Sequence, residues 1–473
     1  MTALADWIHA LPLRYGKRTL IALGVIALLA LIVRAYVVVN PVDHPGDDSR
    51  AYYALSKALY EEQSFGGSEF EDSSDWSPGA PFLYSAAFYA TGGAREGTAR
   101  IVEALLGVGT ILVAFALAWR LGGRAHGRWA GLFAAFAVAV YPPFIHSTGV
   151  IMSEPPAMLT LPAAVLAFLW AADREKRVNP AVPGIWGQLW PWLVPGLLFG
   201  LTAMFRPEYL FVGAAFVLLA GLRGAFGAGR EHGRDWRPGL AAGAVLLVAL
   251  ILPILPWTVR NLVVLDKAVP ISTGGGKALF VGTYLPGDGE YQRVKAILVE
   301  RKLGGHVDPQ SESLDAVDPT PLFDEVAREG HPDLPRDEAL GKIGKENLEK
   351  YLREDPLGYL AMTARKVGRM WSGGVGEAMS GTVGRVVQVL LVLLGLAGFA
   401  LLALRRRWWE IVVLATPIVL ITAIGAISLA PPRRNEVLMT LVFPLAGVAL
   451  SSGLAAISSG REWSSEPASS QPS

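Results

Sequence analysis

Two adjacent acidic residues, Asp47 and Asp48, follow the first long apolar segment of the chain. That segment, residues 19–39, has the length of a membrane-spanning helix. Three basic residues precede it: Arg14, Lys17 and Arg18. The positive-inside rule therefore places the start of the chain in the cytoplasm and the aspartates on the other face of the membrane. The pattern suggests chemistry at the membrane edge, outside the cytoplasm.

Further polar residues fall at the same predicted face, where apolar segments begin or end: Glu154, Arg206, Glu208, Arg260, Asn261, Arg433, Arg434 and Asn435. Acids and bases on helix ends at one face can form a site for a charged substrate that carries a lipid tail. Arginine suits such a site because its planar fork binds phosphate oxygens bidentately.

Each of these residues also has a purely structural interpretation. An arginine at a helix end often extends to the lipid headgroups. Glu154, before Pro155, can stabilise the start of a helix, and the two aspartates can be N-caps of a helix that begins at Ser49. His44 and His146 have no ligand spacing, so they are weak support for a metal site. A requirement for a divalent metal stays open.

The composition defines the class of protein. Of 473 residues, 52% are hydrophobic and 18% charged, and the mean hydropathy is +0.38. The sequence thus predicts an all-α polytopic membrane protein. The formal net charge of +1 gives no bias toward nucleic acid. Cysteine is absent, which excludes disulfides and thiolate chemistry.

About ten membrane-spanning helices are predicted by the apolar segments and the basic loops. They lie near residues 19–39, 100–119, 129–146, 154–172, 190–205, 208–222, 239–258, 383–404, 408–429 and 436–457. Both termini are then cytoplasmic in the plasma membrane, and the site is extracytoplasmic.

Four regions follow from this pattern. Residues 1–260 form a catalytic transmembrane core, whose first outer loop, 41–99, carries amphipathic helices near 49–60 and 81–89. Residues 261–380 form a small outer domain with a helix from Asp337 to Arg353. Residues 381–460 hold the last three spans, and 461–473 form a disordered cytoplasmic tail rich in Ser and Pro.

One phosphate-binding motif fails. The run Gly274-Gly275-Gly276-Lys277 is similar to part of a P-loop, but a P-loop needs Gly at 271 and Ser or Thr at 278. This chain has Ile271 and Ala278 there, and the run lies on the wrong side of the membrane for ATP.

Four passages resemble the GT-C fold glycosyltransferases, in the group of the dolichyl-phosphate-mannose–protein mannosyltransferases and the lipid A aminoarabinose transferase. They are Asp48-Ser49-Arg50-Ala51-Tyr52, the segment 76–84, the segment 139–155 that ends in Ser153-Glu154-Pro155, and Pro256-Trp257-Thr258-Val259-Arg260-Asn261 followed by 269–273. Their order and sidedness, more than any single motif, carry the resemblance, which covers residues 20–290. The family often has Asp-Glu where this chain has Asp47-Asp48, and the spacing to Tyr52 favours Asp48.

The resemblance implies a polyprenyl-phosphate sugar as donor and a hydroxyl of a lipid, glycan or protein as acceptor. Asp48 or Asp47 would be the general base, with Glu154 as a further catalytic candidate. Arg260, Arg206 and Arg434 would bind the donor phosphate, and Tyr52, Glu208 and Asn261 would have acceptor or structural roles. Direct displacement would invert the anomeric centre.

Two other functions compete with this one. A lipid or solute transporter or flippase would be expected to have repeats, broken helices and ionisable residues at mid-membrane, whereas the charges here lie at span ends. A glycan ligase that uses a lipid pyrophosphate is the alternative enzyme.

Overall fold

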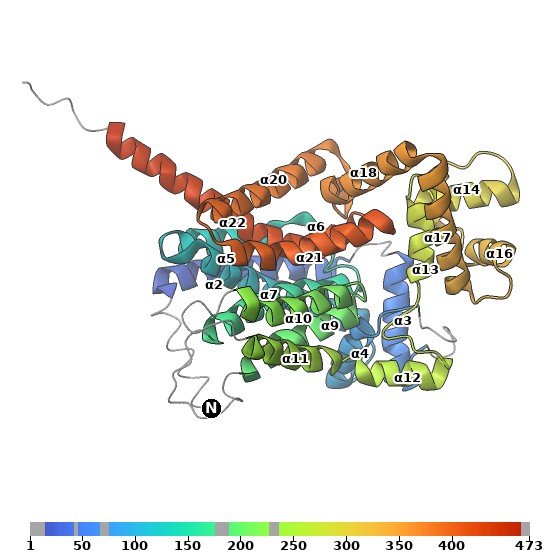
Figure 1. Cartoon of the computed structure of the whole chain (residues 1–473), viewed down its shortest axis with the longest axis horizontal. Helices are drawn as coiled ribbons and strands as arrows, with labels where there is room; N and C mark the ends of the chain where they lie inside the picture. The colour runs from blue at the N-terminus through green and yellow to red at the C-terminus, as the bar shows by residue number, and fades with distance from the viewer. Residues whose placement is uncertain (1–14, 42–45, 67–74, 176–188, 227–235, 465–473) are drawn as a thin grey trace, which may run out of the picture.

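The computed structural model of the chain describes residues 15–41, 46–66, 75–175, 189–226 and 236–464. Every regular element in these ranges is a helix. The long apolar helices lie side by side as a bundle, and the shorter polar helices gather at one end of it (Figure 1). The predicted all-α membrane protein is confirmed.

Six helices of the described ranges are long and apolar enough to cross a membrane. They are α2 (Lys17–Val39), α5 (Glu96–Val140), α7 (Glu154–Glu175), α20 (Thr382–Leu404), α21 (Trp408–Ile427) and α22 (Arg433–Ser464). A further span forms if α11 (Arg237–Ile251) and α12 (Leu255–Leu265), which are bent by 48° relative to each other, are counted together. The apolar helices α9 (Leu193–Phe205) and α10 (Tyr209–Phe226) are shorter.

Helix α5 consists of two antiparallel arms. Gly123 interrupts it with φ 66° and ψ −162°, a left-handed backbone that favours glycine. A Cβ atom at Gly131 would lie 2.8 Å from the ring of Phe115, although 16 residues of straight helix would separate the two by roughly 24 Å. The arms match the predicted segments 100–119 and 129–146, except that the second arm ends at Val140 and α6 (Pro142–His146) follows. Helices thus occupy all ten predicted segments, while the number of crossings stays a prediction.

The first loop contains both expected helices, α3 (Asp47–Glu61) and α4 (Gly79–Thr91), which pack on each other. The N-cap of α3 is Gly46, so Asp47 and Asp48 belong to the first turn and are not the caps of a helix beginning at Ser49. A carboxylate in a first turn is stabilised by the helix dipole. Helix α4 buries Tyr84 and Phe88 completely, so only its other face can contact the membrane surface.

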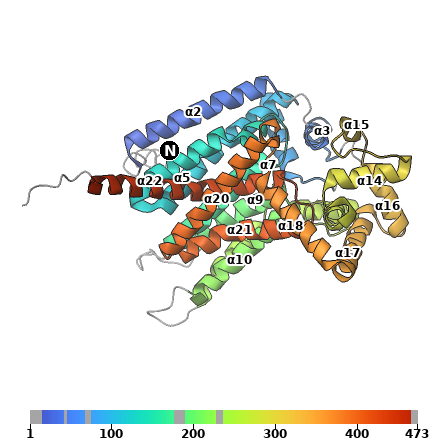
Figure 2. The same cartoon turned by 90° about the horizontal axis from the view of Figure 1, so that it is seen from above.

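Residues 275–372 form a helical unit with its own apolar core, which includes Phe280, Val294, Phe323 and Leu340. Its helices are α13 (Gly275–Thr283), α14 (Tyr291–Leu303), α15 (Glu312–Asp315), α16 (Thr320–Gly330), α17 (Arg336–Glu354) and α18 (Pro356–Ser372), and the short α19 (Glu377–Ser380) follows. The predicted helix 337–353 corresponds to α17. Helices α14, α16 and α17 project from the bundle beside α3 (Figure 2).

Helix α13 attaches this unit to the bundle. The Leu429 amide donates a hydrogen bond of 3.0 Å to the Ala278 carbonyl. A Cβ atom at Gly282 would lie 2.1 Å from the carbonyl carbon of Ser428, so only glycine permits this approach. Helix α13 is thereby fixed beside the segment that leads into α22.

Ion pairs at the opposite end of the bundle join α5, α7 and α21. Arg120 lies 2.7 Å from Asp173 and 3.5 Å from Glu410, and Arg407 lies 2.7 Å from Glu410. Helix α22 continues to Ser464, past the predicted boundary at 460, and residues 465–473 of the predicted tail lie outside the described ranges. Which end of the bundle faces the cytoplasm stays a prediction from the loop charges.

The close contact between α22 and α5 gives a test of the packing. A Cβ atom at Gly447 would lie 2.4 Å from the Ala130 carbonyl oxygen, whereas one at Gly453 would meet no atom within 4 Å. We expect Gly447→Leu to cost about 1–3 kcal/mol by overpacking and to lower the thermal unfolding midpoint of the detergent-solubilised protein. Gly453→Leu, in the same helix, is the control and should leave the midpoint close to that of the unsubstituted protein. Equal midpoints for the two variants would contradict this contact.

Candidate active site

The first turns of α3 and α22 bring together a carboxylate and a guanidinium that lie 385 residues apart in the chain. Arg433 donates a hydrogen bond through Nη1 to Oδ2 of Asp48. Both side chains remain open to solvent, with 37% of Asp48 and 40% of Arg433 exposed. Burial would raise the pKa of the Asp48 carboxyl, but the positive charges of Arg433, Lys277 and Arg206 outweigh burial and lower it. Asp48 is therefore ionised at neutral pH.

A second ion-pair group, formed by Arg206, Glu154 and Glu208, is buried beside the first. Arg206 donates through Nη1 to Glu154, and through Nε and Nη2 to Oε1 of Glu208 at 3.0 and 2.8 Å. Only 13% of Arg206, 3% of Glu154 and 14% of Glu208 is exposed. Burial would raise the pKa of Glu208, but Arg206 and Arg434 lower it to about 2.

This second group links the start of α7 to the turn between α9 and α10. Ser153 adds a hydrogen bond of 3.3 Å to Oε2 of Glu154. The guanidinium of Arg206 is satisfied by protein carboxylates, and both carboxylates are paired with it. The geometry favours a structural role for Arg206 and Glu154 over the expected phosphate-binding and catalytic roles.

Tyr52 lies one helical turn after Asp48 and is buried against the bundle. Its ring packs edge-on against Trp76 at 5.2 Å, and its hydroxyl is hydrogen-bonded to Ser153. Burial raises the pKa of the Tyr52 hydroxyl to about 12. The Ile151 amide also donates to Ser49 Oγ at 2.9 Å, so this turn of α3 is held against the segment before α7.

Arg434 and Asn435 follow Arg433 but point to different partners, because successive helical residues are rotated by roughly 100°. Arg434 donates to Ser428 Oγ at 3.2 Å, and its charge acts on Glu208. Within the described ranges the buried Nε of Arg434 has no hydrogen-bond partner. The buried amide of Asn435 donates to the carbonyls of Met370 and Gly373. Arg434 thus lies on the Glu208 side of the site.

Arg260 and Asn261 lie in α12, and Asn261 contacts the segment that follows this helix, residues 269–271. Asn261 is fully buried and donates to the carbonyls of Val269 and Ile271 at 3.0 and 3.2 Å, which is a structural role. The guanidinium of Arg260 lies over the rings of Trp257 and Phe65 at 4.9 and 5.8 Å. These contacts are with the loop after α3 and with α12 itself.

The sequence predicts no role for two cations near Asp48. Arg433 is one of the polar residues of the predicted face, but the phosphate-binding role is expected of its neighbour Arg434. Lys277 was set aside with the failed P-loop, yet its charge acts on Asp48 once α13 is docked. Gly276 permits that position, because a Cβ atom there would lie 1.8 Å from the Asp337 carbonyl oxygen. A run of glycines before a lysine signals such a close approach.

The expected base Asp47 begins α3, but its side chain lies outside the described part of the structure, so Asp48 is the aspartate whose contacts define the site. In the described ranges no three His, Asp or Glu side chains are grouped as metal ligands would be.

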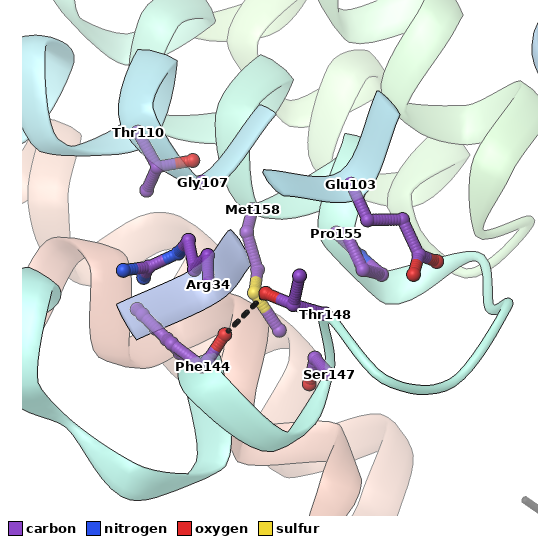
Figure 3. A pocket seen from close by; sticks show the side chains of 9 residues that line it. All are labelled: Arg34, Glu103, Gly107, Thr110, Phe144, Ser147, Thr148, Pro155 and Met158. Carbon is purple, nitrogen blue, oxygen red and sulfur yellow. Dashed lines mark hydrogen bonds between the residues drawn. The ribbon is translucent and has the colours of Figure 1, made fainter. Parts of the chain in front are cut away.

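Two hollows lie near the site. One, of about 10 Å³, is lined by Arg34, Glu103 and Ser147, and the side chains of Arg34 and Glu103 extend in opposite directions (Figure 3). It has room for one water molecule and is too small for a sugar. The other, of about 400 Å³, runs along α3 past Ser49, Tyr53 and Lys57 to Arg100 of α5. Its size is that of a small-ligand site.

Known proteins resemble this chain in sequence and in fold. A sequence profile described as dolichyl-phosphate-mannose-protein mannosyltransferase matches residues 75–265. No curated protein sequence matches the chain.

One similar solved structure is the archaeal oligosaccharyltransferase AglB from Archaeoglobus fulgidus in complex with an inhibitory peptide and a dolichol-phosphate. The two structures superpose with a TM-score of 0.56 at 16% sequence identity, and the match covers 97% of this chain and 53% of the AglB chain. The apo form of the A. fulgidus oligosaccharyltransferase has a TM-score of 0.57 and 16% identity, covering 94% and 52%. ArnT from Cupriavidus metallidurans bound to undecaprenyl phosphate has a TM-score of 0.38 and 15% identity, covering 93% and 79%.

This chain therefore spans about half the length of the oligosaccharyltransferases it matches. The likeness to the oligosaccharyltransferases shows the fold, and the expected GT-C fold is confirmed. The resemblance to the mannosyltransferases, drawn from short passages, agrees with the profile match.

The buried triad yields a stability prediction. Arg206→Gln removes the partner of two buried carboxylates, and leaving such charges uncompensated costs about 3–5 kcal/mol. We expect a clearly lower thermal unfolding midpoint for this variant in detergent. Arg301→Gln is the matched control, because Arg301 is 62% exposed and pairs with Glu329 at 2.7 Å on the surface, where a pair contributes about 0–1 kcal/mol. A normal midpoint for Arg206→Gln would contradict the structural role of Arg206.

Proposed function

We propose that this protein is an integral membrane glycosyltransferase that moves a sugar from a polyprenyl-phosphate donor to a hydroxyl of a lipid, glycan or protein acceptor. The reaction takes place on the extracytoplasmic face of the plasma membrane. The observation that carries this proposal is the solvent-open pair of Asp48 and Arg433 at one end of a GT-C bundle. A carboxylate and a fixed guanidinium side by side provide a base for a hydroxyl and a binding group for a phosphate.

Asp48 is the general base in this scheme. Its carboxylate takes the proton of the acceptor hydroxyl, and the oxygen attacks the anomeric carbon from the side opposite the phosphate. The bond between the anomeric carbon and the phosphate oxygen breaks, and polyprenyl phosphate leaves with the electron pair. The anomeric centre is therefore inverted. No step in this scheme uses a metal ion.

We place the donor phosphate at Arg433, with Lys277 and Arg434 beside it. Arg206 is enclosed by two carboxylates, and Arg260 lies over aromatic rings of α12 and of the loop after α3. These two expected phosphate ligands are therefore less suited to the role. Donors fixed near the departing phosphate stabilise the negative charge that it gains in the transition state.

We assign the approach of the acceptor to the hollow along α3. It is lined by hydroxyl, carboxylate and basic groups, including Ser49, Tyr53, Glu61 and Arg100. Such groups can pair with the hydroxyls of a sugar, and Ser49 directly follows Asp48 in the first turn of α3.

The base assignment is tested by transfer from radiolabelled polyprenyl-phosphate hexoses and pentoses in reconstituted vesicles. We expect Asp48→Asn to lose about 10²–10⁴-fold in rate, because the amide cannot take the proton. Glu329→Gln is the control; Glu329 pairs with Arg301 on the surface of the helical unit, and this variant should keep its activity. Full activity of Asp48→Asn would refute the assignment. Transfer from lipid-pyrophosphate sugars alone would favour the glycan ligase.

Sidedness is tested separately with single cysteines, since the chain has no native cysteine. Ser313 in α15 and Ala125 in the turn of α5 are both exposed at opposite ends of the molecule. On intact cells, a membrane-impermeant maleimide should label Ser313→Cys and should label Ala125→Cys only after lysis, because the basic loops are cytoplasmic. The reverse pattern would place the site in the cytoplasm.

A further inference from the structure

The proposed mechanism requires Asp48 and Arg433 to act on different substrates, yet the structure has them bound to each other. A carboxylate that already accepts a hydrogen bond from a guanidinium is a weakened base, since the cation stabilises its ionised form. A guanidinium held by a carboxylate is likewise partly occupied. The resting pair thus holds both groups away from their chemical tasks.

The charged groups around Asp48 differ in how readily they can change partners. Arg206 is enclosed by Glu154 and Glu208 and is 13% exposed, so its bonds are internal. Lys277 is exposed and acts on Asp48 as a point charge. Arg433 is 40% exposed and makes its described hydrogen bond to Asp48. Arg433 is therefore the guanidinium placed to exchange one anion for another.

We propose that the phosphate of the polyprenyl-phosphate donor competes with Asp48 for Arg433, so that the ion pair is a latch opened by the donor. This inference rests on the proposed function. The arginine fork matches two phosphate oxygens, so the phosphate replaces the carboxylate without leaving the guanidinium unpaired. The carboxylate loses its hydrogen-bond donor and turns to the acceptor hydroxyl.

An order of events follows. The donor binds first and releases the base, and the acceptor is then deprotonated beside an occupied donor site. After transfer, polyprenyl phosphate holds Arg433 until it diffuses away, and the ion pair forms again. In the absence of donor, Asp48 is not available as a base.

The latch is tested by a double-mutant cycle on the binding of undecaprenyl phosphate to the full chain in detergent. We expect Asp48→Asn to tighten binding about fivefold, the scale of one partly exposed ion pair. Arg433→Gln should weaken binding by about thirtyfold or more. In the Arg433→Gln background, Asp48→Asn should change binding less than twofold, because no competition remains. Glu329→Gln removes the same charge from a surface carboxylate paired with Arg301 and should leave binding unchanged.

The outcomes separate the latch from the proposed function. If Asp48→Asn tightens binding equally with and without Arg433, the effect is general charge repulsion and the latch is overturned. If undecaprenyl phosphate binds and transfer occurs but Asp48→Asn changes nothing, the glycosyltransferase stands without the latch. If neither the unsubstituted protein nor Asp48→Asn binds undecaprenyl phosphate while both keep normal unfolding midpoints, the proposed function and the latch fail together.

Discussion

The site depends on one buried cation, Arg206, which holds two carboxylates from different parts of the chain. Taking Glu154 and Glu208 out of water is costly unless each charge is compensated. Arg206 donates three hydrogen bonds to the two carboxylates, and the charge of Arg434 also acts on Glu208. The start of α7 and the turn between α9 and α10 must therefore stay together. Helix α3 packs against the polar ends of these helices, where Tyr52 of α3 is hydrogen-bonded to Ser153, just before α7.

The charged residues of the site fall into two groups according to the solvent exposure of their side chains. The enclosed ions of the triad have no place for a substrate, whereas the solvent-open ions Asp48 and Arg433 can be reached by one. The helical unit of residues 275–372 contributes Lys277 because α13 is anchored on residues 428–429. Residues 428–429 lie just before α22, so the same contact positions both Lys277 of the helical unit and Arg433 of the bundle.

The sequence predicts the helices well because a membrane imposes a simple rule: backbone polar groups in lipid must be satisfied within the segment. Hydropathy therefore located helices in all the expected segments, and α17 was found within one residue at each end. Sequence reasoning also placed Asp48, Glu154, Arg206 and Glu208 at one end, and these residues do meet. The choice between Arg433 and Arg434 depends on the rotation of α22, and the position of Lys277 depends on how α13 docks. Neither is encoded in hydropathy or loop charge.

The separation of Asp48 and Arg433 by 385 residues has a consequence for biosynthesis. At about 5–20 residues per second, the ribosome needs roughly 20–80 s to pass from the aspartate to its arginine. During that time α3 has already been made, but α22, which carries Arg433 and packs against α5, has not. A chain that stops before α22 lacks Arg433, the residue to which we assign the donor phosphate. Under the proposed function, lipid-linked sugar would not be consumed by such a chain, because α22 is the helix that completes the site.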